Sequence, residues 1–240
     1  RHGSLAWSTK KVKSNKKSKK SKKSKKSDKS KKDLIYSPIA VKGALIGVPD
    51  AVDGSGESGT ASFDVGFGYT GAYTAAAHGL VPATVESGLV DQDPDQAFNP
   101  ADGFSNSHVI NVVGAASLRV AIPPGAVPDP AADLDIFLED PNGNIVAAST
   151  NGGTDEEIEI IFPMDGNWTL WVHGWQAVPD PTPYDLYSWV ISATPGGNMT
   201  VDASPASATI GATEPVDISW SGAAAGQWHY GLISHSDGGG

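Results

Sequence analysis

The stretch from position 132 to position 175 constrains the fold of this chain most strongly. Within it Leu134, Ile136 and Leu138 alternate with acidic or aromatic residues, which is the period of two expected of a β-strand with one buried face. A Pro-Asn-Gly-Asn sequence at positions 141–144 then supplies a tight turn. We therefore expect an antiparallel hairpin to begin here.

Three further strands are predicted in the same stretch. Residues 145–148 are interpreted as the return strand, residues 157–162 as the next strand, and a turn at positions 163–166 leads into a strand over residues 168–173. Short strands separated by turns every 8–12 residues or so are typical of β-sandwiches. The composition agrees, because 28 Gly and 17 Pro without long periodic apolar stretches favour an all-β class over helical folds.

Strand patterns on both sides extend this sandwich and begin a second one. Further strands are predicted at positions 60–67, 72–78, 108–113, 117–122 and 184–191. They assign residues 43–195 to one antiparallel β-sandwich of jelly-roll or Ig-like type. Residues 196–240 also show strand patterns but are fewer than the roughly 100 residues that such a domain needs. We therefore predict a truncated second β module with exposed edges where strands are missing.

The net charge of −10 conceals two oppositely charged parts. Residues 1–42 contain 16 basic and two acidic residues, a formal charge of +14, whereas residues 43–240 contain Arg119 and 25 acidic residues, a formal charge of −24. The Lys/Ser-rich insertion at positions 9–33 has almost no apolar side chain to bury, and its like charges repel. We expect the insertion to be disordered. It either has no dedicated role or is a salt-sensitive tether to an anionic surface, to nucleic acid or to the acidic residues 43–240 of the same chain.

Several classes of protein are excluded or disfavoured by composition. The absence of cysteine removes disulfides, cysteine-ligated zinc and thiol catalysis. No window of about 18 apolar residues is present, so no membrane span is expected. The chain starts at Arg1 with neither an initiator Met nor a signal peptide, which leads us to expect a fragment of a longer precursor.

Several short motifs resemble the C-terminal region of secreted subtilisin-like serine proteases, the subtilases. The runs at positions 133–144 and 166–175 look like the pre-peptidase C-terminal type of β-sandwich. Residues 37–41 resemble the end of the fibronectin-like domain of those proteases, and residues 226–238 resemble the start of a further Ig-like module. The resemblance implies three parts: a fibronectin-like end with the insertion at 1–42, a pre-peptidase C-terminal-like sandwich at 43–195, and an incomplete Ig-like module at 196–240.

The first of these parts is expected to contain a hairpin. Residues 3–8 and 34–41 resemble the two closing strands of the subtilase fibronectin-like domain, in which a tight turn joins them. Here the Lys/Ser-rich insertion stands in place of that turn.

The resemblance implies an accessory tail and not a catalytic domain. A subtilase uses Ser, His and Asp, in which the imidazole takes the proton of the attacking hydroxyl and the carboxylate orients the ring. The motifs that surround these residues in subtilases do not occur, and His78-Gly79 and His173-Gly174 share only a dipeptide with the histidine motif. We assign no catalytic residue, and any proteolysis by the parent is expected from an upstream catalytic domain.

A candidate calcium site lies around the predicted hairpin turn. Asp133, Asp135, Asp140, Asn142 and Asn144 offer the hard oxygen ligands that Ca²⁺ takes in proteins. However, the first two lie on one face of the strand and the other three belong to the turn, and Asn-Gly turns are common. The sequence therefore leaves two interpretations open, a calcium site or a strand entry capped by Asp133 and followed by an ordinary turn.

Aromatic residues gather towards the end of the predicted sandwich. They are Trp168, Trp171, Trp175, Tyr184, Tyr187 and Trp189. Most are expected in the core. Trp175, which ends a strand before a Pro-rich loop, and Tyr184 are the candidates for stacking on a sugar ring or contacting a peptide.

Three functional hypotheses follow from these patterns. The first is a non-catalytic accessory region of a secreted subtilase that supports folding, secretion or docking to a substrate or surface. The second is a glycan- or surface-binding β-sandwich of an extracellular protein, and the third is a calcium-stabilised structural module. Each places the chain outside the cell or at its surface, with a protein or polysaccharide surface as the expected partner and no specific nucleic acid.

Overall fold

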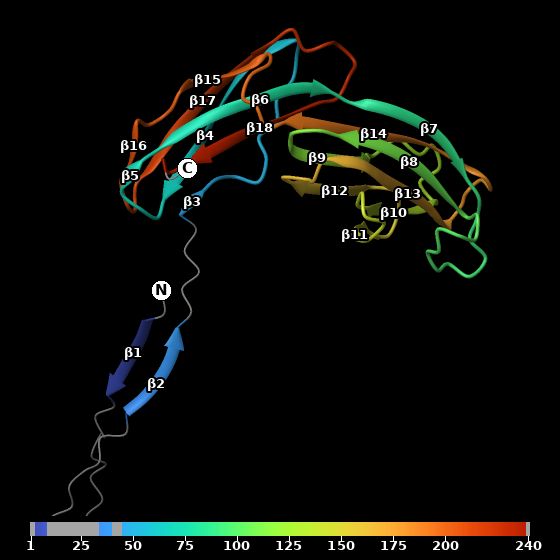
Figure 1. Ribbon diagram of the computed structural model, residues 1–240, viewed down its shortest axis with the longest axis horizontal. Helices are drawn as coiled ribbons and strands as arrows, with labels where there is room; N and C mark the ends of the chain where they lie inside the picture. The colour runs from blue at the N-terminus through green and yellow to red at the C-terminus, as the bar shows by residue number, and fades with distance from the viewer. Residues whose placement is uncertain (1–2, 9–33, 40–44, 239–240) are drawn as a thin grey trace, which may run out of the picture. The chain divides into compact units, whose positions relative to one another are not determined.

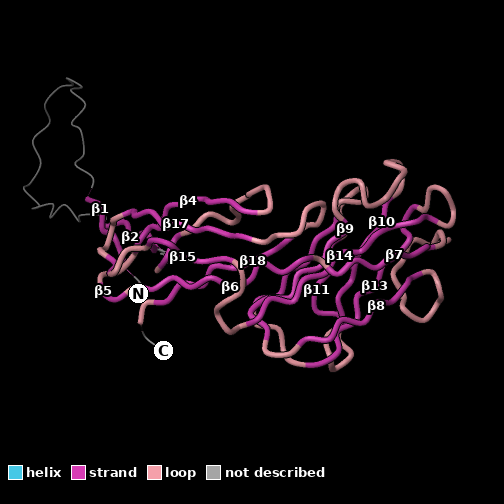
Figure 2. The backbone as a smooth tube through the Cα atoms, turned by 90° about the horizontal axis from the view of Figure 1, so that it is seen from above, coloured by secondary structure: helices cyan, strands magenta, loops and turns pink. Residues whose placement is uncertain are grey.

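The computed structural model describes residues 3–8, 34–39 and 45–238, and the regular structure in these ranges consists of β-strands alone (Figure 1 and Figure 2). The all-β class predicted from the sequence is therefore confirmed. Residues 1–44 and residues 45–240 form two separate units. Within the described ranges no helix is long and apolar enough to cross a bilayer.

The described residues of the first unit, 3–8 and 34–39, form a pair of strands. β1 (Gly3–Ser8) pairs antiparallel with β2 (Leu34–Ile39), in a register that runs from Gly3 opposite Ile39 to Ser8 opposite Leu34. This pairing agrees with the hairpin expected on either side of the Lys/Ser-rich insertion. The insertion itself, residues 9–33, was expected to be disordered and lies outside the described residues.

Two four-stranded sheets form a β-sandwich in the second unit. Their strand orders are β11-β10-β13-β8 and β12-β9-β14-β7, and every pairing within them is antiparallel. The strands are β7 (Thr84–Val90), β8 (Ser105–Val112), β9 (Ala115–Ile122), β10 (Asp133–Glu139), β11 (Ile145–Ser149), β12 (Glu156–Ile161), β13 (Gly166–Gln176) and β14 (Thr182–Ser192).

Alternation along the strands builds the core between these two sheets. On β10, Leu134, Ile136 and Leu138 are fully buried, as their period of two predicted. Across the pairing of β10 with β13, Ile136 lies opposite Val172 and Leu138 lies opposite Leu170. Both sheets contribute to one apolar cluster, which also includes Val112, Leu118, Val120, Ile158 and Leu186.

A second group of strands joins the beginning of this unit to its end. β17 (Thr213–Ser221) lies between β15 (Met199–Ala203) and β4 (Ser58–Phe67), and β4 also pairs with β3 (Ile46–Gly47). β18 (His229–Ser236) pairs with β6 (Thr74–Pro82), and β16 (Ser207–Ala208) pairs with β5 (Gly71–Ala72).

This pairing unites segments that the sequence analysis assigned to different domains. The strands after position 196 were expected to lack neighbours, but β4 and β6 lie beside β17 and β18. The physical reason is that Val65 and Phe67 of β4 share an apolar cluster with Val216 and Ile218 of β17. The domain limits 1–42, 43–195 and 196–240 stay a prediction.

A nearly continuous extended run connects the two groups of strands. Only Ala83 separates β6 from β7, and Figure 1 shows one leading directly into the other. Trp189 and Ile191 of β14 pack against Val81 of β6 and Leu232 of β18. The sandwich and the second group therefore share apolar contacts.

A buried imidazole adds polar contacts at the same place. Nδ1–H of His78 on β6 donates to the backbone oxygen of Ser192, because a carbonyl can only accept, and the two atoms are 2.9 Å apart. Nε2 of His78 forms a hydrogen bond with the hydroxyl of Ser234 on β18, also at 2.9 Å. This one side chain connects β6, β18 and the end of β14.

Replacing Gly174 by Ala is expected to destabilise the sandwich, whereas Gly152→Ala is expected to have little effect. A Cβ at position 174 would overlap the backbone oxygen of Asp91, which cannot rotate away as a side chain could, while a Cβ at position 152 would meet open space. Overpacking of this kind lowers the free energy of unfolding by about 1–3 kcal/mol. Urea titration measures it, and equal stability of the two variants would contradict this close approach.

Candidate functional site

The side chain of Asp140 organises the turn between β10 and β11. Its Oδ1 accepts hydrogen bonds from the backbone N–H groups of Asn142 and Asn144, each at 2.9 Å, and the side-chain amide of Asn144 donates to both carboxylate oxygens at 3.2 Å. These donors, above all the N–H of Asn144, lower the pKa of Asp140. The carboxylate is therefore engaged within the turn, as in the turn interpretation of this sequence.

The five residues considered as calcium ligands do not converge on one point. Asp133 and Asp135 lie at the start of β10, while Asp140, Asn142 and Asn144 follow its end. A strand rises about 3.3 Å per residue, so Asp135 and Asp140 are separated by roughly 16 Å, whereas calcium ligands lie about 2.4 Å from the ion. As a set they do not fit a calcium site. Among the described residues no group of three or more His, Cys, Asp or Glu side chains could hold a metal ion.

Asp135 belongs instead to a buried network centred on His173 of β13. This imidazole is 1% exposed, its Nε2 lies 2.8 Å from Oδ2 of Asp93, and its Nδ1 lies 3.4 Å from Oδ2 of Asp135. Burial acts to lower the pKa of His173, but the hydrogen bonds and charges of Asp135 and Asp93 outweigh it and raise the pKa. The imidazole is therefore held between two carboxyl groups that favour its protonated form.

Asp93 also holds the loop that follows β7. Burial acts to raise its pKa, but the hydrogen bond with His173 and those from Asp95 outweigh it and lower the pKa. Its two oxygens accept the backbone N–H groups of Asp95 at 3.1 Å and Ala97 at 3.2 Å. The buried charge pair therefore fixes this loop against the sandwich.

Two aromatic rings pack beside the same imidazole. Phe98 of the loop stacks on Phe137 of β10 with ring centroids 3.8 Å apart. Both rings lie steeply inclined to the ring of His173, at centroid distances of 6.0 and 6.1 Å. The apolar stack strengthens the buried ion pairs, because it keeps water from the charged groups.

Two more carboxylates lie in the same region without full hydrogen bonding. Glu156 of β12 is 0% exposed, and its Oε1 has no hydrogen-bond partner among the described residues, nor has Oδ1 of Asp133. Burial, together with the negative charge of Asp135, raises the pKa of both groups. Both therefore keep a proton to higher pH than an exposed carboxyl group does.

The two aromatic residues proposed for binding lie in different environments. Tyr184 is 2% exposed, its hydroxyl lies 2.8 Å from Nε2 of His108 and accepts a hydrogen bond from Asn106 at 3.1 Å, and burial raises its pKa to about 12. A binding role for Tyr184 does not fit this position, because no face of its ring is open to a ligand. Trp175, at the end of β13, is 37% exposed and can contact a partner.

The histidines of the described chain do not form a serine-protease arrangement. His78 bonds to the hydroxyl of Ser234 but to a backbone oxygen on its other side, and His173 bonds to carboxylates alone. Within the described ranges no imidazole joins a serine hydroxyl to a carboxylate, which is the geometry that activates a serine nucleophile.

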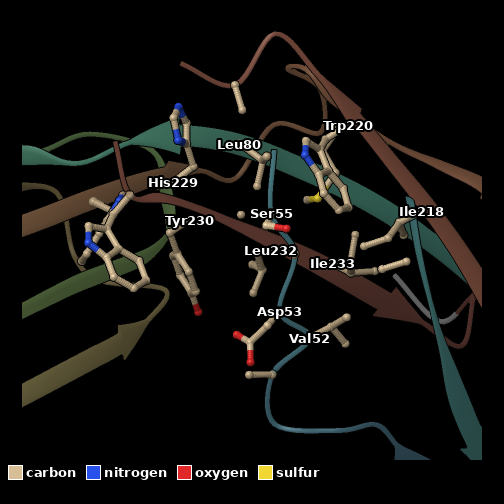
Figure 3. A pocket seen from close by; sticks show the side chains of 18 of the residues that line it. Val52, Asp53, Ser55, Leu80, Ile218, Trp220, His229, Tyr230, Leu232 and Ile233 are labelled. Atoms are coloured by element: carbon tan, nitrogen blue, oxygen red, sulfur yellow. The ribbon is translucent and has the colours of Figure 1, made fainter. Parts of the chain in front are cut away.

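A cavity of about 680 Å³ lies beside β18, where the sequence predicted no site (Figure 3). Residues 48–57 and 223–229 and strands β4, β17 and β18 contribute to its walls. Its apolar lining includes Leu80, Ile218, Trp220, Tyr230, Leu232 and Ile233. Each of these residues fits the ordinary alternation of its own strand, so no local sequence pattern predicts the cavity.

Part of the chain is similar in sequence to pyrolysin from Pyrococcus furiosus. The match is 32% identical over 111 residues, which cover 44% of this chain and 7% of pyrolysin. No protein-family model matches. A solved structure described as "Structural basis for the promiscuous specificity of the carbohydrate-binding modules from the beta-sandwich super family" is 13% identical with a TM-score of 0.19, covering 66% of this chain and 90% of that one.

The stability of the protein is expected to fall as the pH rises from about 6.5 through the raised folded-state pKa of His173. Because the pKa of His173 is raised in the folded state, its contribution is complete below the unfolded-state pKa of about 6.5 and is lost as the pH rises through the folded-state value. Urea titrations across this range should show a smaller decrease for His173→Gln than for the wild type. His229→Gln serves as the control, and equal pH slopes for wild type and His173→Gln would contradict the assignment.

Removal of the Asp140 carboxylate is expected to destabilise the hairpin turn independently of calcium. Asp140→Ala breaks hydrogen bonds to N–H groups, so its melting temperature should drop by a few degrees equally in EDTA and in excess Ca²⁺. Asp155→Ala, at an exposed position of the same sandwich, is the control. A loss of stability seen only with Ca²⁺ would restore the calcium interpretation.

Proposed function

We propose that this chain is part of the non-catalytic C-terminal region of a secreted subtilisin-like serine endopeptidase. The observation that carries the proposal is the 32% identity over 111 residues with part of pyrolysin, a subtilisin-like protease. The chain spans 7% of pyrolysin, so the activity of the whole parent belongs to the proposal as well. Proteolysis is assigned to an upstream catalytic domain, which is the proposed partner of this chain outside the cell.

The role assigned to this region is docking of polypeptide substrate. A cavity with apolar walls beside β18 supports it, since unfolded polypeptide exposes apolar side chains that a folded surface does not. Residues 43–240, which contain Arg119 and 25 acidic residues, would favour basic substrates and repel acidic ones. Support of folding or secretion remains part of the same proposal.

The three domain types form part of the proposal. Residues 1–42 are assigned to the end of a fibronectin-like domain, residues 43–195 to a pre-peptidase C-terminal-like sandwich, and residues 196–240 to an Ig-like module. The two four-stranded sheets of β7 to β14 support the second assignment. The pairing of β4 with β17 adds residues 58–67 to the strands that accompany the third.

Glycan binding is the second candidate function. Trp175 and Trp228 are 37% and 63% exposed, and exposed indole rings are common platforms for sugar rings. Retention of the chain on an insoluble polysaccharide, lost on Trp175→Ala, would favour this role over substrate docking.

Deletion of this region from its parent protease is expected to impair cleavage of large substrates selectively. A docking module raises the local concentration of a protein substrate but does not touch a short one. We expect kcat/KM for an unfolded protein substrate to drop by about tenfold, with less than about a twofold change for a short chromogenic peptide. Equal losses for both substrates would indicate a structural role, and no change for either would reject docking.

A further inference from the structure

β18 has a strand partner along one edge. It pairs with β6 in a register that runs from His229 opposite Pro82 to Ser236 opposite Thr74. Among the described residues no strand pairs with its opposite edge. An unpaired edge presents backbone N–H and C=O groups that another strand can bind.

The cavity lies where this edge meets two sheets of unequal width. The sheet β15-β17-β4-β3 has four strands, whereas the sheet β18-β6 that packs on it has two. Val65 and Phe67 of β4 are buried between them, but Phe63 of β4 and Ile233 of β18 remain half-buried. The described strands therefore leave part of the apolar surface between these two sheets uncovered near β18.

Figure 3 shows how the lining side chains surround this space. Tyr230 lies towards one end and Trp220 towards the other, with Leu232 of β18 between them and Ile233 on the same side as Trp220. The segment that carries Asp53 crosses in front of them, and it forms no strand pairing. Apolar side chains and β18, the strand with one unpaired edge among the described residues, thus line the same cavity.

The charges around the cavity are predominantly negative. Asp50, Asp53 and Glu57 are exposed on the segment 48–57. Arg119 also lines the cavity, but its guanidinium pairs with Glu157 and lies 4.5 Å from the ring centroid of Tyr230. Basic side chains on a bound molecule would therefore meet carboxylates at the rim.

We propose that this cavity binds an extended polypeptide segment that pairs with the unpaired edge of β18. Main-chain hydrogen bonds to β18 supply the register, and apolar side chains at alternate positions enter the space lined by Ile218, Trp220 and Ile233. Lys or Arg residues flanking the apolar positions contact Asp50 and Asp53. The ligand is a partner in trans with this pattern, an unfolded segment of a protein substrate.

Other occupants fit the same observations less well. The Lys/Ser-rich insertion has no apolar residue between positions 13 and 33, so it cannot fill the cavity floor. A sugar could stack on Trp228, which also lines the cavity, but it would leave the strand edge unpaired, and the indole Nε1–H of Trp220 is already donated to the backbone oxygen of Gly56 at 3.1 Å. A peptide strand uses both the apolar floor and the strand edge.

Binding of labelled peptides to the full chain tests this inference. The probe is a fluorescein-labelled peptide of about ten residues with alternating Val and Thr between terminal lysines, and binding is followed by fluorescence polarisation. A peptide of the same length with Pro at alternate positions lacks half of the N–H donors and should bind about tenfold more weakly or not at all. Affinity for the first peptide should decrease as salt is added.

Two variants with different effects on the cavity complete the test. Ala61→Phe fills the space from the half-buried position of β4, and the double change Asp50→Lys with Asp53→Lys reverses the charge of the exposed rim without altering the core. Each should weaken binding by about tenfold or more. Asp155→Lys, at an exposed position that does not line the cavity, should leave it unchanged.

Several results would overturn the inference. The inference is wrong if the alternating peptide does not bind, or if both cavity variants bind it as tightly as the wild type does. It is also wrong if oligosaccharides displace the peptide but unlabelled peptide does not. A third contrary result is light scattering that shows dimers whose formation blocks peptide binding. The choice of a polypeptide ligand rests on the proposed docking function, but the binding assay needs no protease. Peptide binding without an effect of deletion on proteolysis would reject that function alone, and the reverse result would reject this site alone.

Discussion

The pairing of β17 with β4 is the interaction on which the second group of strands depends. It places Val216 opposite Phe63 and joins segments that lie far apart in the sequence. Because β6 follows β4 and β18 follows β17, the same pairing brings those two strands together as well. The shared contacts of β6, β14 and β18 then connect this group to the sandwich. The cavity beside β18 is a product of the same arrangement, since its walls come from both ends of the unit.

The sandwich of β7 to β14 combines an apolar core with a buried charged network at one end. Placing His173 between Asp93 and Asp135 costs desolvation of three groups, and the hydrogen bonds between them offset it. Through Asp93 the network also holds the loop that follows β7. It also explains why carboxylates that resemble metal ligands in sequence serve another purpose, since Asp135 is engaged by an imidazole and Asp140 by backbone N–H groups.

The proposed accessory role and the proposed peptide site describe one physical strategy. The 25 acidic residues against Arg119 in residues 43–240 would disfavour acidic partners, while the described strands leave one edge of β18 unpaired and part of the apolar surface beside it uncovered. Natural proteins normally cover such an edge, and here the segment 48–57 lies across the cavity without pairing. An extended substrate segment would complete the core that the described strands leave open.

The sequence by itself determined the β class, the hairpin from β10 to β11 and the buried face of Leu134, Ile136 and Leu138, because alternation and turn chemistry act over a few neighbouring residues. It could not determine that β4 pairs with β17, since a strand pattern states which face is apolar and not which strand lies beside it. The same limit applies to Asp135, whose partner His173 is 38 residues away. The burial of Tyr184, the His173 network and the cavity beside β18 were decided by the tertiary structure, because each depends on side chains that only folding brings into contact.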